Sequence, residues 1–483
     1  MTEKEQELHN RAYAEVKRHQ QQVMADPYRQ SFHLMPPVGL LNDPNGWIQW
    51  NGTYHMFYQW NPFAASHGAK FWGHYSSTDM VNWTEEPIAL APSEWFEKNG
   101  CYSGSAVDVN GQLTLMYTGN VKDEKGNRQS YQCVATSDDG VHFDKKGPVV
   151  DELPEGYTAH FRDPKVWQEN GRWYMIIGAQ TEDEQGRALL YQSEDFQTWT
   201  FTGPLAGAGI GQVDSFGYMW ECPDMFSLEG KDILIVSPQG LEPEGMVYHN
   251  KYQAGYFIGE ANLNDPVFHH GEFTELDRGF EFYAPQTTVD DRGRRIIVGW
   301  MGVPEQDEED HPTIENQWVH CLTIPRELHL SNGRLLQKPV EELKQLRHTP
   351  VRFEQKEIHA RTTQLDGIAG TTVELLFENL STVGELFEWT FRGDARLIYN
   401  KQERIMTLER KHIKTRLMER RQCYVEQLHD VQIFMDSSSL EIFINGGEEV
   451  FTSRYFPDPS DQSITIRSSQ PAAITVQKWD LDV

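Results

Sequence analysis

Leu41-Asn42-Asp43-Pro44-Asn45-Gly46 is the stretch that decides the fold, because it opens the first of several similar units along the chain. A strand-like run follows it, then a turn at Asn51-Gly52, and then a second run that ends near Tyr58. The same pattern of strand, glycine turn and strand returns around Gly111, Gly171, Gly230 and Gly293, at spacings of 59, 60, 59 and 63 residues. A period of about sixty residues built from strands is typical of a β-propeller, in which each repeat forms one blade. The sequence therefore predicts five blades.

A second series has the same period and consists of an acidic residue four positions before an aromatic one. Its members are Asp79 with Trp83, Asp139 with Phe143, and Asp195 with Trp199. Because two independent series keep the same phase, a chance repeat is a poor explanation of either one.

Three carboxylates occupy the same place in different units. Asp43 lies nine residues before its turn glycine, Asp163 eight before and Glu221 nine before, each close to a proline. Equivalent positions of different blades surround one central channel, so we expect these three side chains to converge there. Like charges that converge are costly, and a chain seldom keeps them without a use.

Composition and charge limit the partners. The chain has 483 residues, with 43 basic against 72 acidic side chains and a formal net charge of −29. Such an excess of negative charge argues against nucleic acid or an anionic membrane surface as a partner. The five cysteines are an odd number without the paired spacing of a zinc site, so we expect reduced thiols. The charged N-terminal residues and the lack of a long apolar segment predict a soluble, cytoplasmic protein.

Changes in residue pattern along the chain predict four segments. Residues 1–31 form a helical arm, because Leu8, Ala12 and Val16 recur at helical spacing. Residues 32–336 carry the repeats and form the propeller, and residues 337–349 form a linker helix. In residues 350–483 the repeat is lost but side-chain character alternates, which predicts a β-sandwich. The expected fold class is therefore all-β: a five-bladed β-propeller followed by a C-terminal β-sandwich, with a short N-terminal helix.

Three converging carboxylates suit the cleavage of a glycosidic bond. One carboxylic acid protonates the leaving oxygen, and one carboxylate attacks the anomeric carbon or activates water. A third can stabilise the positive charge of the transition state or bind the sugar hydroxyls. The residues alone leave these roles unassigned among Asp43, Asp163 and Glu221.

Two other interpretations compete with catalysis. Each acid can be a turn or cap residue next to a proline. Three acids can also bind a hard cation, but no Asp/Asn-rich loop of calcium-binding spacing accompanies them. We therefore expect neither a metal nor a cofactor.

Six motifs in order give the chain a resemblance to a known family. They are Asn42-Asp43-Pro44-Asn45-Gly46, Phe57-Tyr58-Gln59-Trp60-Asn61-Pro62, Trp72-Gly73-His74, Tyr102-Ser103-Gly104-Ser105, Phe161-Arg162-Asp163-Pro164 and Trp220-Glu221-Cys222-Pro223-Asp224. In order and spacing the chain resembles the family 32 glycoside hydrolases, which include invertases, sucrose-6-phosphate hydrolases and fructanases. The family is a propeller followed by a β-sandwich, in agreement with the repeat count.

The resemblance implies roles that the spacing left open. It implies Asp43 as the nucleophile, Glu221 as the general acid and then base, and Asp163 as the transition-state stabiliser. It also implies substrate contacts from Leu41, Asn42, Gln59, Trp72, Tyr102, Ser103, Arg162 and Trp300. The chain departs from the pattern at Tyr102, where relatives often have Phe, and at His67, where several have Trp.

The resulting hypothesis is a retaining β-fructofuranosidase that acts on a small sugar, sucrose or sucrose-6-phosphate, through a covalent fructosyl intermediate. The first alternative is a furanosidase of the arabinanase and xylosidase type, which usually inverts. The second is a propeller that binds sugar without chemistry. The sequence does not indicate an oligomeric state.

Overall fold

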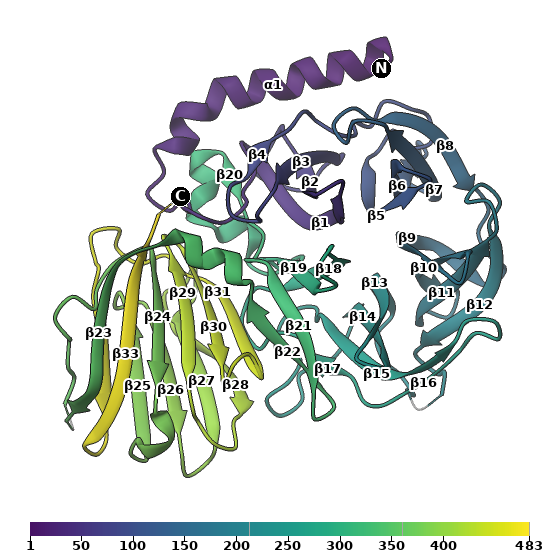
Figure 1. Cartoon of the computed structure of the whole chain (residues 1–483). Coiled ribbons are helices and arrows are strands. Elements are labelled where there is room, and N and C mark those ends of the chain that lie inside the picture. Colours follow the sequence, from purple (N-terminus) through teal and green to yellow (C-terminus); the bar gives the residue numbers. More distant parts are fainter. Residues whose placement is uncertain (212, 360, 483) are drawn as a thin grey trace.

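The computed structural model describes residues 1–211, 213–359 and 361–482. A ring of sheets forms one part of the molecule, a pair of packed sheets forms the other, and helix α1 (Glu3–Met24) lies across the edge of the ring (Figure 1). The all-β fold class with its N-terminal helix is thus confirmed. Among the described residues, no helix is both long and apolar enough to cross a membrane.

Five sheets make up the ring, one for each predicted repeat. The first contains β1 (Gly39–Trp50), β2 (Thr53–Asn61), β3 (Phe71–Ser77) and β4 (Thr84–Glu85). The second contains β5 (Cys101–Val109), β6 (Gln112–Lys122), β7 (Arg128–Ser137) and β8 (Asp144–Val150). The third contains β9 (Tyr157–Glu169), β10 (Arg172–Thr181), β11 (Gly186–Ser193) and β12 (Thr200–Gly207).

The last two blades carry additions. The fourth contains β13 (Met219–Leu228), β14 (Lys231–Gln239), β15 (Gly255–Asn262), β16 (Val267–His270) and the short β17 (Thr274–Glu275), which pairs with β15. The fifth contains β18 (Tyr283–Val289), β19 (Arg295–Trp300), β21 (Arg326–Ser331) and β22 (Arg334–Pro339). Between β19 and β21 lie the 3-10 helices η1 (Glu308–Asp310) and η2 (Pro312–Asn316).

The predicted turn glycines join the first two strands of every blade. All five have a positive φ, between 77° and 86°, which an L side chain rarely adopts. In the first three blades the preceding residue is an asparagine that also has a positive φ. Two consecutive positive φ values are typical of the type I′ turn that suits a twisted hairpin. The glycine period therefore marked the hairpins correctly.

The aspartates of the second series lie just after the third strand of a blade ends. In each of the first three blades its aspartate accepts hydrogen bonds from two backbone N–H groups, two and three residues farther on. Such side-chain bonds to the local backbone stabilise a tight turn. The repeated acid is thus a turn residue rather than part of a site.

The ring closes through a short strand that the repeat did not predict. Strand β20 (Trp318–Val319) follows η2 and pairs in parallel with the start of β1, so that Trp318 lies opposite Gly39. A segment from the end of the propeller thus completes the first blade. Helix α1 packs on the outside of this closure, and Gln22 Nε2 donates to the Glu315 carbonyl oxygen at 2.7 Å.

Two sheets form the β-sandwich. One contains β23 (Arg347–Ile358), β24 (Val373–Glu378), β29 (Val431–Asp436), β30 (Ser439–Ile444), β31 (Glu449–Arg454) and β33 (Ala472–Leu481). The other contains β25 (Leu386–Phe391), β26 (Ala395–Asn400), β27 (Ile405–Lys411), β28 (Met418–Tyr424) and β32 (Ile464–Ser468). Their facing side chains bury a core of their own. The 3-10 helix η4 (Leu380–Thr382) lies between β24 and β25.

The connection between propeller and sandwich is short. Strand β22 ends at Pro339, the 3-10 helix η3 (Glu341–Leu346) follows, and β23 begins at Arg347. The segment predicted as a linker helix, 337–349, therefore holds the end of one strand, η3 and the start of another. Phe434, Phe443 and Val450 of the sandwich belong to the same apolar cluster as residues of the first and fifth blades.

Candidate active site

An identical irregularity interrupts the innermost strand of every blade. Between two paired positions this strand advances three residues while its neighbour advances two, which defines a one-residue β-bulge. The bulged residues are Asn42-Asp43, Tyr102-Ser103, Asp163-Pro164, Cys222-Pro223 and Ala284-Pro285. A bulge re-aims the side chains of its strand, so five strands present these residues or their neighbours to one channel.

The backbone at three of the bulges is in the left-handed region. The φ values are 66° at Asp163, 48° at Cys222 and 47° at Ala284. Residues other than glycine adopt this region at a cost of the order of 1 kcal/mol or more, and they do so where the surrounding structure imposes it.

The three carboxylates predicted to converge lie together in the structure. The Cys222 thiol contacts both Asp43 Oδ2, at 3.7 Å, and Asp163 Oδ2, at 3.6 Å. The Cys222 backbone N–H donates to Asp163 Oδ2 at 3.0 Å, and Glu221 is the preceding residue. Side chains from the first, third and fourth blades thus share one site.

Asp43 is fixed by two donors. Ser103 Oγ donates to its Oδ2 at 2.5 Å, and Asn42 Nδ2 donates to its Oδ1 at 3.0 Å. Burial raises the pKa of Asp43, as does the nearby Glu221 charge, while both hydrogen bonds act in the opposite direction. The carboxylate is therefore held in one orientation beside other negative charge.

Glu221 accepts hydrogen bonds on both oxygens. Arg162 reaches Oε1 through Nε at 2.9 Å and Nη2 at 2.6 Å. Gln239 Nε2 donates to Oε2 at 2.9 Å, and the Tyr283 hydroxyl donates to the same oxygen at 2.7 Å. Burial would raise the pKa of Glu221, but Arg162 and the Tyr283 hydrogen bond outweigh it and lower the pKa.

Asp163 shows the opposite shift. Burial raises its pKa, the Glu221 charge raises it further, and Arg162 only partly opposes them. In the free protein the group of three carboxylates therefore binds a proton more readily at Asp163 than at Glu221.

The predicted binding residues lie at different depths, and only some of them contact the carboxylates. Asn42, Ser103 and Arg162 contact the carboxylates directly, as described above. Gln59 is buried and donates to the Cys101 carbonyl oxygen at 2.9 Å. Leu41 and Trp72 have no exposed surface, and Trp72 Nε1 donates to the Tyr102 carbonyl oxygen at 3.0 Å, which supports the Tyr102 bulge from behind.

Two polar atoms of the site have no hydrogen-bond partner among the described residues. They are Asn42 Oδ1, an acceptor, and Trp300 Nε1, a donor. Buried polar atoms are rarely left without a partner, but both atoms are closed off from solvent in this structure, so neither is open to a sugar hydroxyl. The Trp300 ring is fully buried and packs edge-on against Tyr283 and His67.

His67, which departs from the family pattern, belongs to a charged chain at the rim. Its Nε2 lies 2.9 Å from Glu308 Oε1, and its Nδ1 lies 3.0 Å from Lys70 Nζ. Lys70 is almost completely buried, and burial lowers its pKa to about 7 despite the Asp43 and Glu308 charges.

Sequence reasoning missed several residues of the site. Tyr283 and Gln239 contact Glu221, and His160 contacts Arg162. Tyr283 could have been found, since it lies two residues before Pro285 as Glu221 lies two residues before Pro223, directly before the bulge of its strand. Gln239 also had a signal, since it lies nine residues after its turn glycine as Asn61, Asn120 and Gln180 do, whereas none singled out His160.

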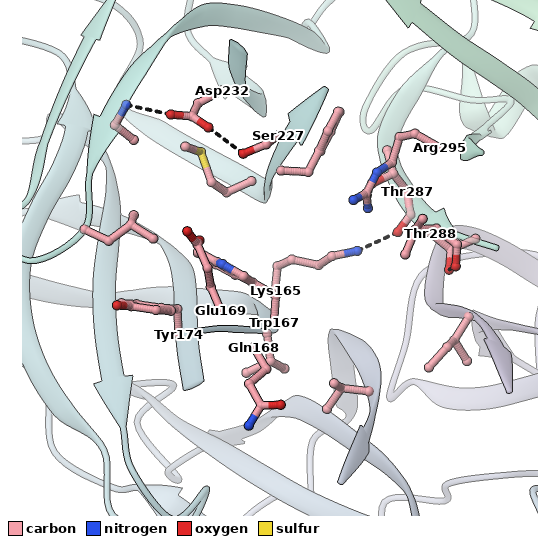
Figure 2. A pocket seen from close by; sticks show the side chains of 18 of the residues that line it. Lys165, Trp167, Gln168, Glu169, Tyr174, Ser227, Asp232, Thr287, Thr288 and Arg295 are labelled. Carbon is pink, nitrogen blue, oxygen red and sulfur yellow. Dashed lines mark hydrogen bonds between the residues drawn. The ribbon is translucent and has the colours of Figure 1, made fainter. Parts of the chain in front are cut away.

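A separate cavity of about 610 Å³ opens farther along the same innermost strands (Figure 2). Its walls include Lys165, Ser227 and Thr287, several residues beyond the bulges, and the catalytic candidates do not line it. Lys165 Nζ donates to the Thr287 carbonyl oxygen at 2.6 Å and pairs with Asp224 at 3.2 Å. Because its main cation is already paired, this cavity has no evident chemistry, and the carboxylate group is the better candidate site.

Among the described residues, no group of three or more His, Cys, Asp or Glu side chains is arranged to bind a metal ion. The five cysteines are unpaired. The arrangement that remains is three carboxylates with oriented donors, which suits acid–base and nucleophilic chemistry on a sugar.

Comparison with known proteins agrees with this chemistry. Residues 33–339 match the glycosyl hydrolases family 32 N-terminal domain, and residues 342–480 match the family 32 C-terminal domain. The chain is 54% identical to the sucrose-6-phosphate hydrolase of Bacillus subtilis (strain 168) over 485 residues, with 100% of both chains covered.

Solved structures give the same result. The sucrose-6-phosphate hydrolase from Lactobacillus gasseri superposes with a TM-score of 0.88 at 32% identity, covering 97% of this chain and 96% of that one. The family 32 β-fructofuranosidase of Bombyx mori superposes with a TM-score of 0.85 at 34% identity, covering 98% of both chains.

Proposed function

Since the chain belongs to glycosyl hydrolase family 32, we propose that it hydrolyses the fructosyl bond of sucrose-6-phosphate, and of sucrose less well. The observation that carries this proposal is the contact of one residue, Cys222, with both Asp43 and Asp163, directly beside Glu221. Three carboxylates this close to one another fit around a single sugar ring.

Asp43 is proposed as the nucleophile. One of its oxygens bonds to the anomeric carbon of fructose while the bond from that carbon to the bridging oxygen breaks. The hydrogen bonds from Ser103 and Asn42 hold the carboxylate in one orientation. Less orientational entropy is therefore lost when the transition state forms. Water then displaces Asp43, and the fructose is released with its configuration retained.

Glu221 is proposed as the general acid that protonates the bridging oxygen, and as the base that activates water in the second step. This role requires a proton that the free protein holds more readily at Asp163. Fructose hydroxyls that donate to Asp163 favour its ionised form and so lower its pKa. Substrate binding therefore moves the proton of the group towards Glu221, where the first step needs it.

Asp163 is proposed as the stabiliser of the transition state. Once ionised it lies next to the ring that develops positive charge, and the Cys222 N–H holds it in place. Arg162 forms an ion pair with Glu221, and its positive charge reduces the electrostatic repulsion among the three carboxylates.

The choice of substrate follows from the relatives. The Bacillus subtilis and Lactobacillus gasseri proteins are both sucrose-6-phosphate hydrolases. A mutant of the Bombyx mori β-fructofuranosidase has been solved in complex with sucrose. A phosphorylated sugar does not diffuse through a membrane, so an enzyme that acts on it works in the cytoplasm, where unpaired cysteines stay reduced.

The test is an assay of the purified protein with sucrose-6-phosphate and with sucrose. We expect a higher kcat/KM for the phosphorylated sugar and an initial fructose product of β configuration by NMR. Asp43→Asn and Glu221→Gln should each lose at least about a thousandfold in kcat while retaining the wild-type thermal unfolding profile. Near wild-type turnover in either variant, or an inverted first product, would overturn the proposal.

A further inference from the structure

A half-buried arginine without a counter-ion lies next to the candidate active site. Arg128 is the first residue of β7, at the end of the β6–β7 hairpin, where its backbone pairs with Lys122. Among the described residues its guanidinium makes no hydrogen bond and no ion pair, and its only partner is the Tyr102 ring, with the Cζ 5.8 Å from the ring centroid. Other buried or half-buried arginines without a carboxylate partner, such as Arg29 and Arg392, donate to backbone carbonyl oxygens, whereas no such bond is seen for Arg128 among the described residues.

Arg128 is surrounded by charges of both signs. Burial lowers its pKa and the charge of Arg162 lowers it further, whereas Tyr102, Glu221 and Asp163 act in the opposite direction. Arg162 Nη1 lies 3.0 Å from His160 Nδ1. Since a guanidinium only donates, His160 Nδ1 is an acceptor, and the proton of the neutral ring lies on Nε2. His160 Nε2 makes no hydrogen bond among the described residues, so it is a second free donor.

The opposite side of the site has the opposite charge. The blades follow one another around the ring in chain order, so the junction of the second and third blades, with Arg128 and His160, faces the fifth blade. There the acidic run from Glu305 to Asp310 borders the site: Glu308 contacts His67, and Glu305 contacts the Tyr252 hydroxyl. The cations of that side, Lys70 and Lys414, lie beside Glu308 and Asp310, so carboxylates already balance their charge.

The proposed mechanism fixes which end of the substrate meets Arg128. If Asp43 and Asp163 bind fructose, the leaving oxygen lies at Glu221, and Arg162 connects Glu221 to His160. The glucose part therefore extends beyond Glu221 towards the second and third blades. A sugar phosphate carries a charge of about −1.5 to −2 at neutral pH and has three acceptor oxygens. The arginine fork matches two of them.

We propose that Arg128, assisted by His160 Nε2, binds the 6-phosphate of the substrate's glucose part and so selects sucrose-6-phosphate over sucrose. This inference depends on the proposed function, because it places the glucose part by the roles of Asp43 and Glu221. The Tyr102 ring contacts the guanidinium, a contact that the Phe of many relatives would also make.

The test compares both substrates in Arg128→Gln and in a matched control. Loss of one charge-assisted contact should raise KM for sucrose-6-phosphate about 10- to 100-fold and leave kcat/KM for sucrose within about threefold. Arg128→Lys, which keeps the charge but loses the fork, should recover part of the loss. Lys122→Gln removes the same charge from the exposed position across the hairpin, and it should change neither substrate.

Direct binding separates this inference from the proposed function. Titration calorimetry with glucose-6-phosphate needs no turnover, and we expect binding to the wild type that weakens at least tenfold in Arg128→Gln. Equal losses for both substrates, or unchanged discrimination in Arg128→Gln, would overturn the inference even if the enzyme is active. A wild type that hydrolyses neither sugar but binds glucose-6-phosphate through Arg128 would instead refute the proposed function and support the phosphate site.

Discussion

A buried histidine between two carboxylates should make stability depend on alkaline pH. His33 precedes the first blade, and its Nδ1 lies 2.8 Å from Asp436 Oδ2 while its Nε2 lies 2.8 Å from Glu441 Oε1. Both acids belong to the sandwich, and none of the three side chains is exposed. Burial acts to lower the pKa of His33, but the two hydrogen-bonded carboxylates outweigh it and raise the pKa from 6.5 to about 9.

The sign and size of the effect follow from this shift. The folded protein binds the His33 proton more tightly than the unfolded chain, so the stabilisation is complete below pH 6.5 and is lost as the pH rises to about 9. One pKa unit corresponds to about 1.36 kcal/mol, so this change in the pKa of His33 contributes about 3 kcal/mol to the free energy of unfolding. This is a large share of the stability of an ordinary domain, which is about 5–15 kcal/mol.

Urea unfolding of the wild type and of His33→Gln at pH 6, 8 and 9.5 measures the effect. The difference in unfolding free energy should be about 3 kcal/mol at pH 6 and should fall below about 1 kcal/mol at pH 9.5, because the wild-type histidine is then neutral. His142→Gln is the control, since His142 also lies 2.8 Å from a carboxylate but is 73% exposed. A difference between wild type and His33→Gln that stays constant with pH would refute the reasoning.

Two further predictions concern the pH profile of kcat/KM. Lys70→Met removes a buried cation that favours ionised Asp43, so the acid limb of the profile should move to higher pH by up to about one pH unit. An unchanged acid limb would contradict an effect of the Lys70 charge on Asp43. Tyr283→Phe removes a hydrogen bond at 2.7 Å that favours ionised Glu221, so the pKa of Glu221 should rise and the alkaline limb should move to higher pH. A shift of that limb to lower pH would count against Glu221 as the group that must be protonated.

The repeat made most of the fold predictable from the sequence. Glycine turns and the Asp79-type turns recur because each hairpin needs the same backbone conformations, and these constrain residue type. The closure by Trp318 was not predictable in this way, since a two-residue strand leaves no periodic pattern. The linker was predicted as a helix of 337–349, but apolar spacing at Leu343 and Leu346 also suits the one short 3-10 helix that forms there.

The site was predictable only in part. Phase along the chain located the bulge of each inner strand to within a residue or two, since Glu221, Asp163 and Asp43 occupy three successive positions there, but it does not report what lies beside the bulge. It identified Asp43, Asp163 and Glu221. It also marks Gln239, which lies nine residues after its turn glycine as Asn120 and Gln180 do. It could not identify Arg128, whose contact with the site depends on how a hairpin ends. The position of Arg128 follows from tertiary packing, which a single sequence does not encode as a pattern.

The five bulges help to decide whether the three carboxylates shape the backbone or serve the reaction. An aspartate beside a proline is a common turn former, so Asp43 or Asp163 could have been placed to make the bulge. However, the fifth blade has the same bulge at Ala284-Pro285, and the second has it at Tyr102-Ser103. Because the backbone adopts this shape without a carboxylate, the shape does not require one. The cost of placing three acids at these positions therefore needs another cause, and the proposed reaction provides it.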